Sequence, residues 1–468
     1  MSKSPNPAGM RSSWSIPSTW VALFLTAIVV AVGSFVLREF VAKQQVANRL
    51  EEIRRSGAPT DDASMESLFT TVANTDNSVA WNELGFLASG WVSTMGHDLP
   101  AFGNEVTPAT AYTDGTWQSG DRVGELLEQI QPLIQQVHSA ADKTNGPVWQ
   151  PIHFDGFNTL LGPIQEARSI SRLLQLDYEY AVFIKDRQRA LRDLKSSCAA
   201  IRAYQWDMFL VGELVNIAQM GMVYNSVGQS LKSPMWTIED LNELKSMFDK
   251  PIDLNSRWNK LIATERAAAL PSLTDIENTA SMLAAVRGNN NDFGSSIFVW
   301  AAKLPSSQLR LLKDFDEFKV VGKSSLENIL HESSKIDQQG SRGILSSLVS
   351  PSVTALARVY INMEESRRML LAAIALKQYK LSHGAFPMNL EELLSDSTLS
   401  ITRGELEGVD HTLFRTRLYD AQTIVIWNTR SINGYGNSLP SFDAEIPKHD
   451  KNSGYPSDGR YGTVISFQ

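Results

Sequence analysis

Charged side chains one turn apart on a predicted helix are the first candidates for chemistry in this sequence. Glu364 and Glu365 precede Arg367 and Arg368, so carboxylates and guanidinium groups three and four residues apart can meet on one helix face. Two interpretations follow: an acid–base patch, or a solvated charged face that only supports the helix. The second is the more common use of this spacing, and we expect it here.

Two other charged groups allow a similar choice. Thr264 is followed by Glu265 and Arg266, which form either a functional pair or a helix-surface ion pair, and we expect the surface pair. His331 is followed by Glu332, but the second histidine four residues later that a helical zinc-protease motif requires is missing. This pair therefore predicts no metal site.

Four isolated residues complete the search for chemistry. His383 lies near the predicted end of a long helix, where a cation complements the helix dipole; a ligand or catalytic role is the alternative. Cys198 lies on the apolar stripe of a predicted helix, so we expect a small buried hydrophobe. Trp149 and His153 share a proline-bounded loop and are the most pocket-like pair. Because no nucleophile elbow, phosphate loop or dinucleotide fingerprint occurs, we assign no catalytic, cofactor-binding or metal-ligating residue and expect no cofactor.

The composition is that of an ordinary globular protein. The chain has 468 residues, of which 43% are hydrophobic and 20% charged, and its net charge is −8. A nucleic-acid surface needs clustered lysine and arginine, and no such block occurs, so we exclude nucleic acid as a partner. Cys198 is the only cysteine, which excludes an intramolecular disulfide and a cysteine zinc site.

The rest of the chain is organised around the stretch from Trp20 to Leu37, which contains no charged residue. As a helix it would be about 27 Å long, close to the ~30 Å hydrocarbon core of a bilayer. We therefore predict an uncleaved transmembrane helix that binds the lipid bilayer. The alternatives are a cleaved signal peptide ending near Ala31-Val32-Gly33 and a buried core helix. The anchor is favoured because bulky residues, Phe35-Val36-Leu37, continue the apolar run past that site.

The charges around this helix bear on its orientation. Two basic residues and no acid precede it, whereas the basic residues that follow it are interleaved with acids. Counted literally, the positive-inside rule places the large domain inside, but long domains translocate largely regardless of flanking charge. We predict a single-pass membrane protein with its large C-terminal domain outside the cytoplasm. Small residues four apart, Ala22 with Thr26 and Ala27 with Ala31, allow helix pairing and hence a homodimer.

Composition and periodicity divide the chain into five parts. These are a cytoplasmic tail (1–19), the transmembrane helix (20–37), a juxtamembrane stalk helix (38–60), a helical body (61–350), and a long helix with a small sheet (351–468). The stalk is expected to lift the body off the lipid and to end at Ser56-Gly57-Ala58-Pro59, where glycine caps a helix and proline forbids its continuation.

The body shows helical periodicity throughout. Apolar stripes predict helices over 121–141, 167–181, 191–201 and 210–231, the last three packing as antiparallel neighbours. Gly221 and Gly228 cost helix propensity, so we expect another helix to approach closely there. The segment from Thr237 to Asp240 predicts a capping box that starts a helix ending at Phe248.

The C-terminal part predicts a long helix followed by strands. Ser350 and Pro351 should open this helix as its N-cap and first turn. Runs rich in β-branched and aromatic residues then predict strands over 412–419, 422–429 and 461–467. The fold class is therefore mainly α, with a small antiparallel sheet packed against the long helix as an α+β end.

Two segments carry a family resemblance. Tyr379 to Leu393, with Gly384, Phe386 and Pro387 in its centre, resembles the helix–Gly–x–aromatic–Pro turn of type II secretion pseudopilins. In this likeness glycine ends the helix, the aromatic ring fills the corner, and proline starts a short helix whose leucines fold back. With its anchor, its stalk (54–60) and its helical segment (168–218), the chain resembles uncharacterised single-pass membrane proteins of planctomycete-type bacteria. It lacks the prepilin cleavage site. The planctomycete-type resemblance implies a bacterial inner-membrane protein of this architecture, without an assigned activity.

These features predict a membrane-anchored envelope scaffold or protein-interaction module that is not an enzyme. Its protein partner is not specified by the sequence. The alternatives are an accessory component of a secretion apparatus and an enzyme whose site is assembled only in three dimensions. A buried cluster of unpaired acids or histidines in a cleft would favour the enzyme, whereas packed helices with an exposed apolar groove would favour the module.

Overall fold

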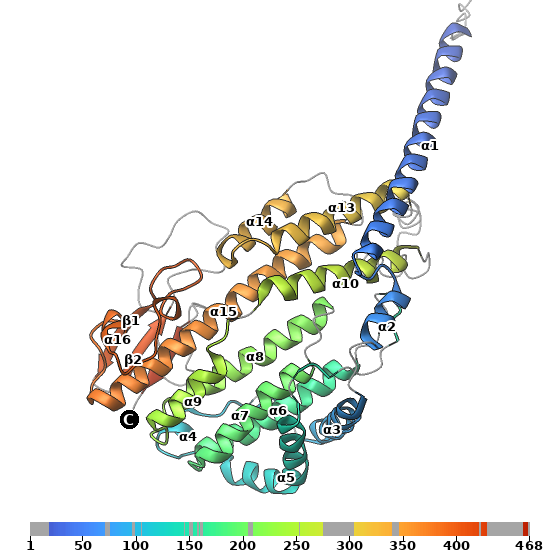
Figure 1. Ribbon diagram of the computed structural model, residues 1–468. Helices are drawn as coiled ribbons and strands as arrows, with labels where there is room; N and C mark the ends of the chain where they lie inside the picture. The colour runs from blue at the N-terminus through green and yellow to red at the C-terminus, as the bar shows by residue number, and fades with distance from the viewer. Residues whose placement is uncertain are drawn as a thin grey trace, which may run out of the picture.

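The computed structural model describes residues 18–70, 75–95, 99–103, 105–144, 146–148, 153–156, 159, 162–204, 209–251, 253–274, 304–338, 346–420, 423–427 and 462–466. Within these residues the protein is mainly helical, as predicted. One long helix, α1 (Ser18–Arg55), projects from a body in which the other helices pack together (Figure 1).

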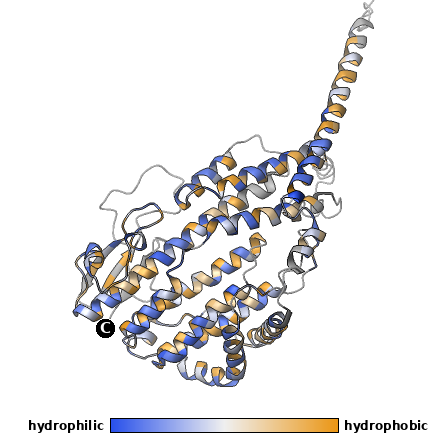
Figure 2. Cartoon of the chain, in the orientation of Figure 1, coloured by the Kyte–Doolittle hydropathy of each residue, from blue (hydrophilic) through white to orange (hydrophobic). Residues whose placement is uncertain are grey.

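Helix α1 changes character along its length. Its outer part is hydrophobic, and polar residues begin where it reaches the body (Figure 2). Apolar side chains of the outer part are exposed, for example Phe24 at 67% and Val29 at 69%. In the part of the chain that the structure describes, α1 is the helix long and apolar enough to cross a membrane. The predicted continuation beyond Leu37 as helix is confirmed, and Gly57, with φ of 78°, follows its end.

The first half of the body is a set of helices that contribute to three apolar clusters. Its elements are α2 (Asp62–Thr70), α3 (Thr75–Thr94), α4 (Ala109–Thr113), α5 (Gly120–Asp142), α6 (Gly162–Phe183), α7 (Arg187–Ala203) and α8 (Leu210–Ser230). The predicted helices over 121–141, 167–181, 191–201 and 210–231 are confirmed, and α6, α7 and α8 contact one another. The expectation for Gly221 is wrong, because a Cβ there would meet no atom within 4 Å.

The second half packs around a long helix. Its elements are α9 (Ile238–Phe248), α10 (Leu254–Thr274), α13 (Pro305–Val321), α14 (Leu326–Gln338) and α15 (Ser346–His383). The capping box between Thr237 and Asp240 is confirmed. The predicted start of α15 is wrong: the helix begins at Ser346, so Ser350 is not its N-cap and Pro351 lies in its second turn. The sequence rule that places proline in the first turn therefore misplaced the start of this helix by about one turn.

The chain after α15 turns back on the body. Gly384, with φ of 75°, follows the last residue of α15 and ends it as predicted. Phe386 is buried, and α16 (Glu391–Ser395) begins four residues after Pro387, with Leu393 buried. A short 3-10 helix, η1 (Arg403–Glu405), follows. Strands β1 (Arg415–Asp420), β2 (Thr423–Trp427) and β3 (Gly462–Ser466) pair antiparallel in the order β1-β2-β3, with Val425 opposite Arg417 and Val464.

Candidate functional site

The junction of α1 with α13 is the candidate functional site, because it joins the apolar helix to the body. Helix α13 starts with Pro305 after Leu304, which provides no side-chain cap. Glu39 of α1 takes this role: its Oε2 accepts the backbone N–H of Ser306 at 2.9 Å, and its Oε1 accepts the Ser306 hydroxyl at 2.7 Å. A carboxylate at a helix N-terminus is also favoured by the helix dipole.

Further contacts continue this junction toward the end of α1. Arg49 pairs with Asp316 of α13 at 2.8 Å. A small apolar cluster joins α1, α10 and α13, and its buried members are Val46, Ile53, Leu270 and Leu312. Residues 39–55 are therefore packed on the body, and the predicted stalk does not stand free of it.

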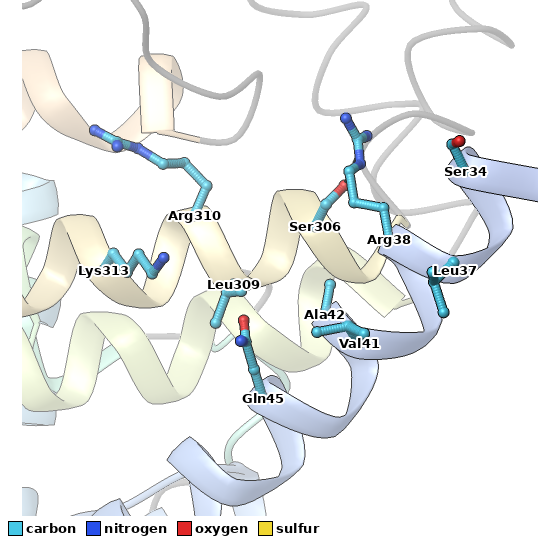
Figure 3. Close-up of a pocket in the computed structure, with 10 residues that line it drawn as sticks. All are labelled: Ser34, Leu37, Arg38, Val41, Ala42, Gln45, Ser306, Leu309, Arg310 and Lys313. Carbon is cyan, nitrogen blue, oxygen red and sulfur yellow. Dashed lines mark hydrogen bonds between the residues drawn. The ribbon is translucent and has the colours of Figure 1, made fainter. Parts of the chain in front are cut away.

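A pocket of about 580 Å³ lies in the corner between the two helices (Figure 3). Its charged lining residues are Arg38 of α1 with Arg310 and Lys313 of α13, and no acid lies among the described residues that line it. Arg38 pairs with Glu39 at 2.9 Å, and Arg310 pairs with the buried Asp314 at 2.9 Å. The remaining lining residues are polar or apolar: Ser34, Leu37, Val41, Ala42, Gln45, Ser306 and Leu309. The pocket thus combines an apolar wall with a cationic rim.

A polar cluster is buried between α5, α6 and α7. His138 Nε2 lies 2.8 Å from Asp193 Oδ1, and Asp177 accepts bonds from Arg189 Nε at 3.1 and 3.2 Å. Burial, reinforced by the nearby charge of Asp177, raises the pKa of Asp193 well above its usual range. Burial lowers the pKa of His138. The Asp177 and Asp193 side chains are both fully buried, whereas Arg189 is 23% exposed.

The predicted solvated face on α15 is wrong. Glu364 and Arg367 are only 4% and 5% exposed, and Glu365 is also buried. Glu364 Oε1 accepts from Arg367 Nη2 at 2.7 Å and from Arg368 Nε at 2.8 Å. Burial opposes ionisation of Glu364, but these bonds outweigh it and lower its pKa. The group is buried because α9 and the segment before β1 cover this face, and Arg367 Nη1 donates to the carbonyl of Phe248 at 2.8 Å.

A cavity of about 300 Å³ adjoins this group between α10, α14 and α15. Tyr360, Glu364 and Arg368 line it. The Tyr360 hydroxyl donates to Glu213 of α8, which also accepts from Arg257 Nη2 at 2.8 Å. Tyr360 is therefore bonded to α8, whereas Glu364 is bonded to Arg367 and Arg368 of its own helix.

The predicted surface pair at residues 264–266 is also wrong. Thr264 and Arg266 are buried, since α10 packs against α2 and α13. Glu265 accepts the backbone N–H of Leu210 at 2.6 Å, at the start of α8. Burial raises the pKa of Glu265 to about 7, against the opposing effect of that bond. Arg266 Nη2 donates to the carbonyl of Pro59 at 3.4 Å.

The histidines considered in the sequence have separate neighbours. His383 is stacked on Tyr379, with ring centroids 4.1 Å apart, and bonds to its carbonyl at 3.1 Å. Glu332 pairs with Lys335 at 2.7 Å next to His331. His153 Nδ1 lies 2.9 Å from Glu66 Oε1, whereas Trp149 lies outside the described residues.

Cys198 is buried in the main apolar cluster, as predicted, and burial raises the pKa of its thiol to about 11. In the described part of the chain, no group of three or more His, Cys, Asp or Glu side chains could hold a metal ion.

The residues of the junction, Glu39, Ser306, Arg310 and Lys313, are not indicated by any sequence motif. Two features of the sequence point to these residues: Glu39 is the first acid after the uncharged run, and Arg310 and Asp314 have the i, i+4 spacing of a helical ion pair. Neither feature predicts that α1 and α13 contact each other. Comparison with family models, curated proteins and solved structures finds no match to this chain.

Proposed function

We propose that this protein is a single-pass protein of a bacterial inner membrane whose helical body, outside the cytoplasm, is an envelope scaffold or protein-interaction module. The observation that carries this proposal is the two-part character of α1. Its outer part is apolar and exposed, and its inner part is fixed to the body through Glu39 and Arg49. Lipid is the environment that makes such an exposed apolar helix favourable.

The packing of α1 sets how the body would meet the membrane. Because Glu39 follows the uncharged run almost directly and already contacts Ser306, no flexible tether separates the two parts. The body therefore lies against the bilayer surface and presents a fixed set of faces to its surroundings. A rigid mount of this kind suits a scaffold.

A surface for a protein partner is supported by α3. Val79, Phe86 and Leu87 are exposed at 60%, 74% and 46%, and an exposed apolar patch of this kind is typical of interaction sites. Pairing of α1 through its small residues would bring two such bodies together as a homodimer.

Cell fractionation tests the membrane placement. The full-length chain should sediment with membranes, resist an alkaline carbonate wash and be released by detergent. Variants Val29→Asp and Val32→Asp, at exposed positions, should weaken this association without unfolding the body. Recovery of the intact chain in the supernatant would contradict the proposal. Proximity crosslinking from the body in cells should then identify protein neighbours, and protease access in intact cells should test the orientation.

Two alternative functions each have one supporting observation. The turn at Gly384, the buried Phe386 and a small sheet packed against α15 support a pseudopilin-like α+β end, and hence an accessory component of a secretion apparatus. The cavity lined by Tyr360, Glu364 and Arg368 supports an enzyme. Crosslinking to secretion components would favour the first alternative, and a small molecule retained in this cavity after purification would favour the second.

A further inference from the structure

The pocket between α1 and α13 has the chemistry of an amphipathic ligand. One wall is apolar, formed by Leu37 and Val41 of α1 with Leu309 of α13, and the rim is cationic. Its volume of about 580 Å³ is in the range of pockets for small-molecule ligands.

The charges around the pocket leave an excess of positive charge at its rim. Two acids of the described residues pair with these cations or lie beside them: Glu39, which bonds to Ser306 and Arg38, and Asp314, which pairs with Arg310. The charged groups at the pocket are therefore three cations, Arg38, Arg310 and Lys313, and two acids. The two acids are largely buried, with side chains 12% and 0% exposed, whereas Arg38 is 64% exposed. The field at the open side of the pocket therefore favours an anion.

The position of the pocket along α1 specifies where that anion would come from. Ser34 and Leu37 belong to the uncharged run, and Arg38 is the first charged residue after it. If α1 spans the ~30 Å hydrocarbon core, Arg38 lies at the level of the lipid headgroups on the side of the body. Lipid phosphates lie just outside the hydrocarbon, and acyl chains extend along the apolar part of the helix.

We propose that this pocket binds one anionic phospholipid from the leaflet that faces the body. Its phosphate and headgroup lie among Arg38, Arg310 and Lys313, and an acyl chain follows Leu37 toward the membrane interior. The bound lipid fills the corner between α1 and α13 and holds the body at one angle to the bilayer. This inference rests on the proposed function, because it requires α1 to cross the membrane.

Lipid titration of the full-length protein in detergent micelles tests the site. Phosphatidylglycerol or phosphatidylcholine is added, and bound lipids are counted by native mass spectrometry. We expect one phosphatidylglycerol to bind in preference to phosphatidylcholine. The variant Arg38→Gln/Lys313→Gln should lower the apparent affinity for phosphatidylglycerol about 30-fold, from the loss of two cations near the membrane surface. Arg310 is kept, because its loss would leave the buried Asp314 unpaired.

The matched control is Lys43→Gln/Arg55→Gln, which removes two exposed cations of α1 that do not line the pocket. It should bind phosphatidylglycerol as the natural chain does, and circular dichroism should show both variants folded. Equal binding of the two lipids, or equal loss in the control variant, would overturn the inference. Flotation of the protein with vesicles distinguishes failure of the lipid site from failure of the proposed function. A chain that floats but shows no lipid preference refutes only the lipid site. A chain that does not float refutes the membrane anchor.

Discussion

Glu39 on α1 caps the first turn of α13 by accepting both the backbone N–H and the hydroxyl of Ser306, 267 residues away in the sequence. Helix α13 begins without a side-chain cap of its own, and one of its free N–H groups, that of Ser306, is satisfied by a residue of α1. One side chain therefore both stabilises a helix of the body and attaches α1 to it.

Removing this carboxylate should destabilise the junction. Glu39→Ala should lower the free energy of unfolding by about 1–2 kcal/mol, the usual cost of losing a helix cap. Urea denaturation of the full-length protein in detergent, followed by circular dichroism, measures it. Glu51→Ala is the control, because Glu51 pairs with the exposed Arg55 one turn away; it should change stability by less than about 0.5 kcal/mol. Equal losses of stability in Glu39→Ala and Glu51→Ala would show that the Glu39 cap does not stabilise the junction.

Two glycines should respond in opposite ways to replacement by alanine. At Gly322 a Cβ would lie 2.7 Å from Cγ of the buried Trp258, so Gly322→Ala should cost about 1–3 kcal/mol through overpacking. At Gly221, inside α8, the Cβ meets open space, so Gly221→Ala should stabilise by up to about 1 kcal/mol. Thermal unfolding of the two variants checks both signs, and a stabilised Gly322→Ala protein would refute the close contact with Trp258.

The buried ion pair on α15 should be costly to break. Arg367→Met removes one partner of Glu364 and the bond to the Phe248 carbonyl, and should destabilise the protein by about 3 kcal/mol. Lys335→Met breaks an exposed pair with Glu332 and should cost less than about 1 kcal/mol. The denaturant midpoints of the two variants, measured under the same conditions, test this prediction. Similarly small losses of stability in both variants would indicate that Glu364 and Arg367 lie on a solvated face.

Glu265 should make stability depend on pH. Its pKa is raised by burial from 4.5 to about 7, so the folded state binds its proton more tightly than the unfolded state. Its contribution to stability is present below pH 4.5 and is lost as the pH rises to about 7. Relative to the natural chain, Glu265→Gln should become progressively more stable across this window. Glu332→Gln is the exposed control and should show no such gain; a flat difference for Glu265→Gln would show that its pKa is not raised.

The reactivity of the Cys198 thiol tests whether this residue is buried in the core. Burial raises the pKa of Cys198 to about 11 from 9.0, which lowers its thiolate fraction about 100-fold at neutral pH. Folded protein should therefore react with a maleimide at least about 100-fold more slowly than free cysteine, and react fully in denaturant. Mass spectrometry of timed samples measures the rate. Fast labelling without denaturant would place Cys198 outside the apolar cluster.

Local patterns in the sequence determined much of the architecture. The uncharged run predicted α1, apolar periodicity predicted α5 to α8, and Thr237 with Asp240 predicted the start of α9. Gly384 predicted the end of α15. Each of these depends on interactions within one or two helical turns, because backbone satisfaction, capping and the helical period are local.

Only the tertiary structure decided which charged residues are covered. Glu364 with Arg367, and Glu265 with Arg266, have the spacing of solvated pairs, yet other elements pack over them. The period of a helix identifies its apolar face, but it does not say which element will lie across the polar one. The meeting of Glu39 with Ser306 and the cationic pocket beside it have the same origin. They depend on contacts between residues far apart in the chain, which the arrangement of whole helices fixes.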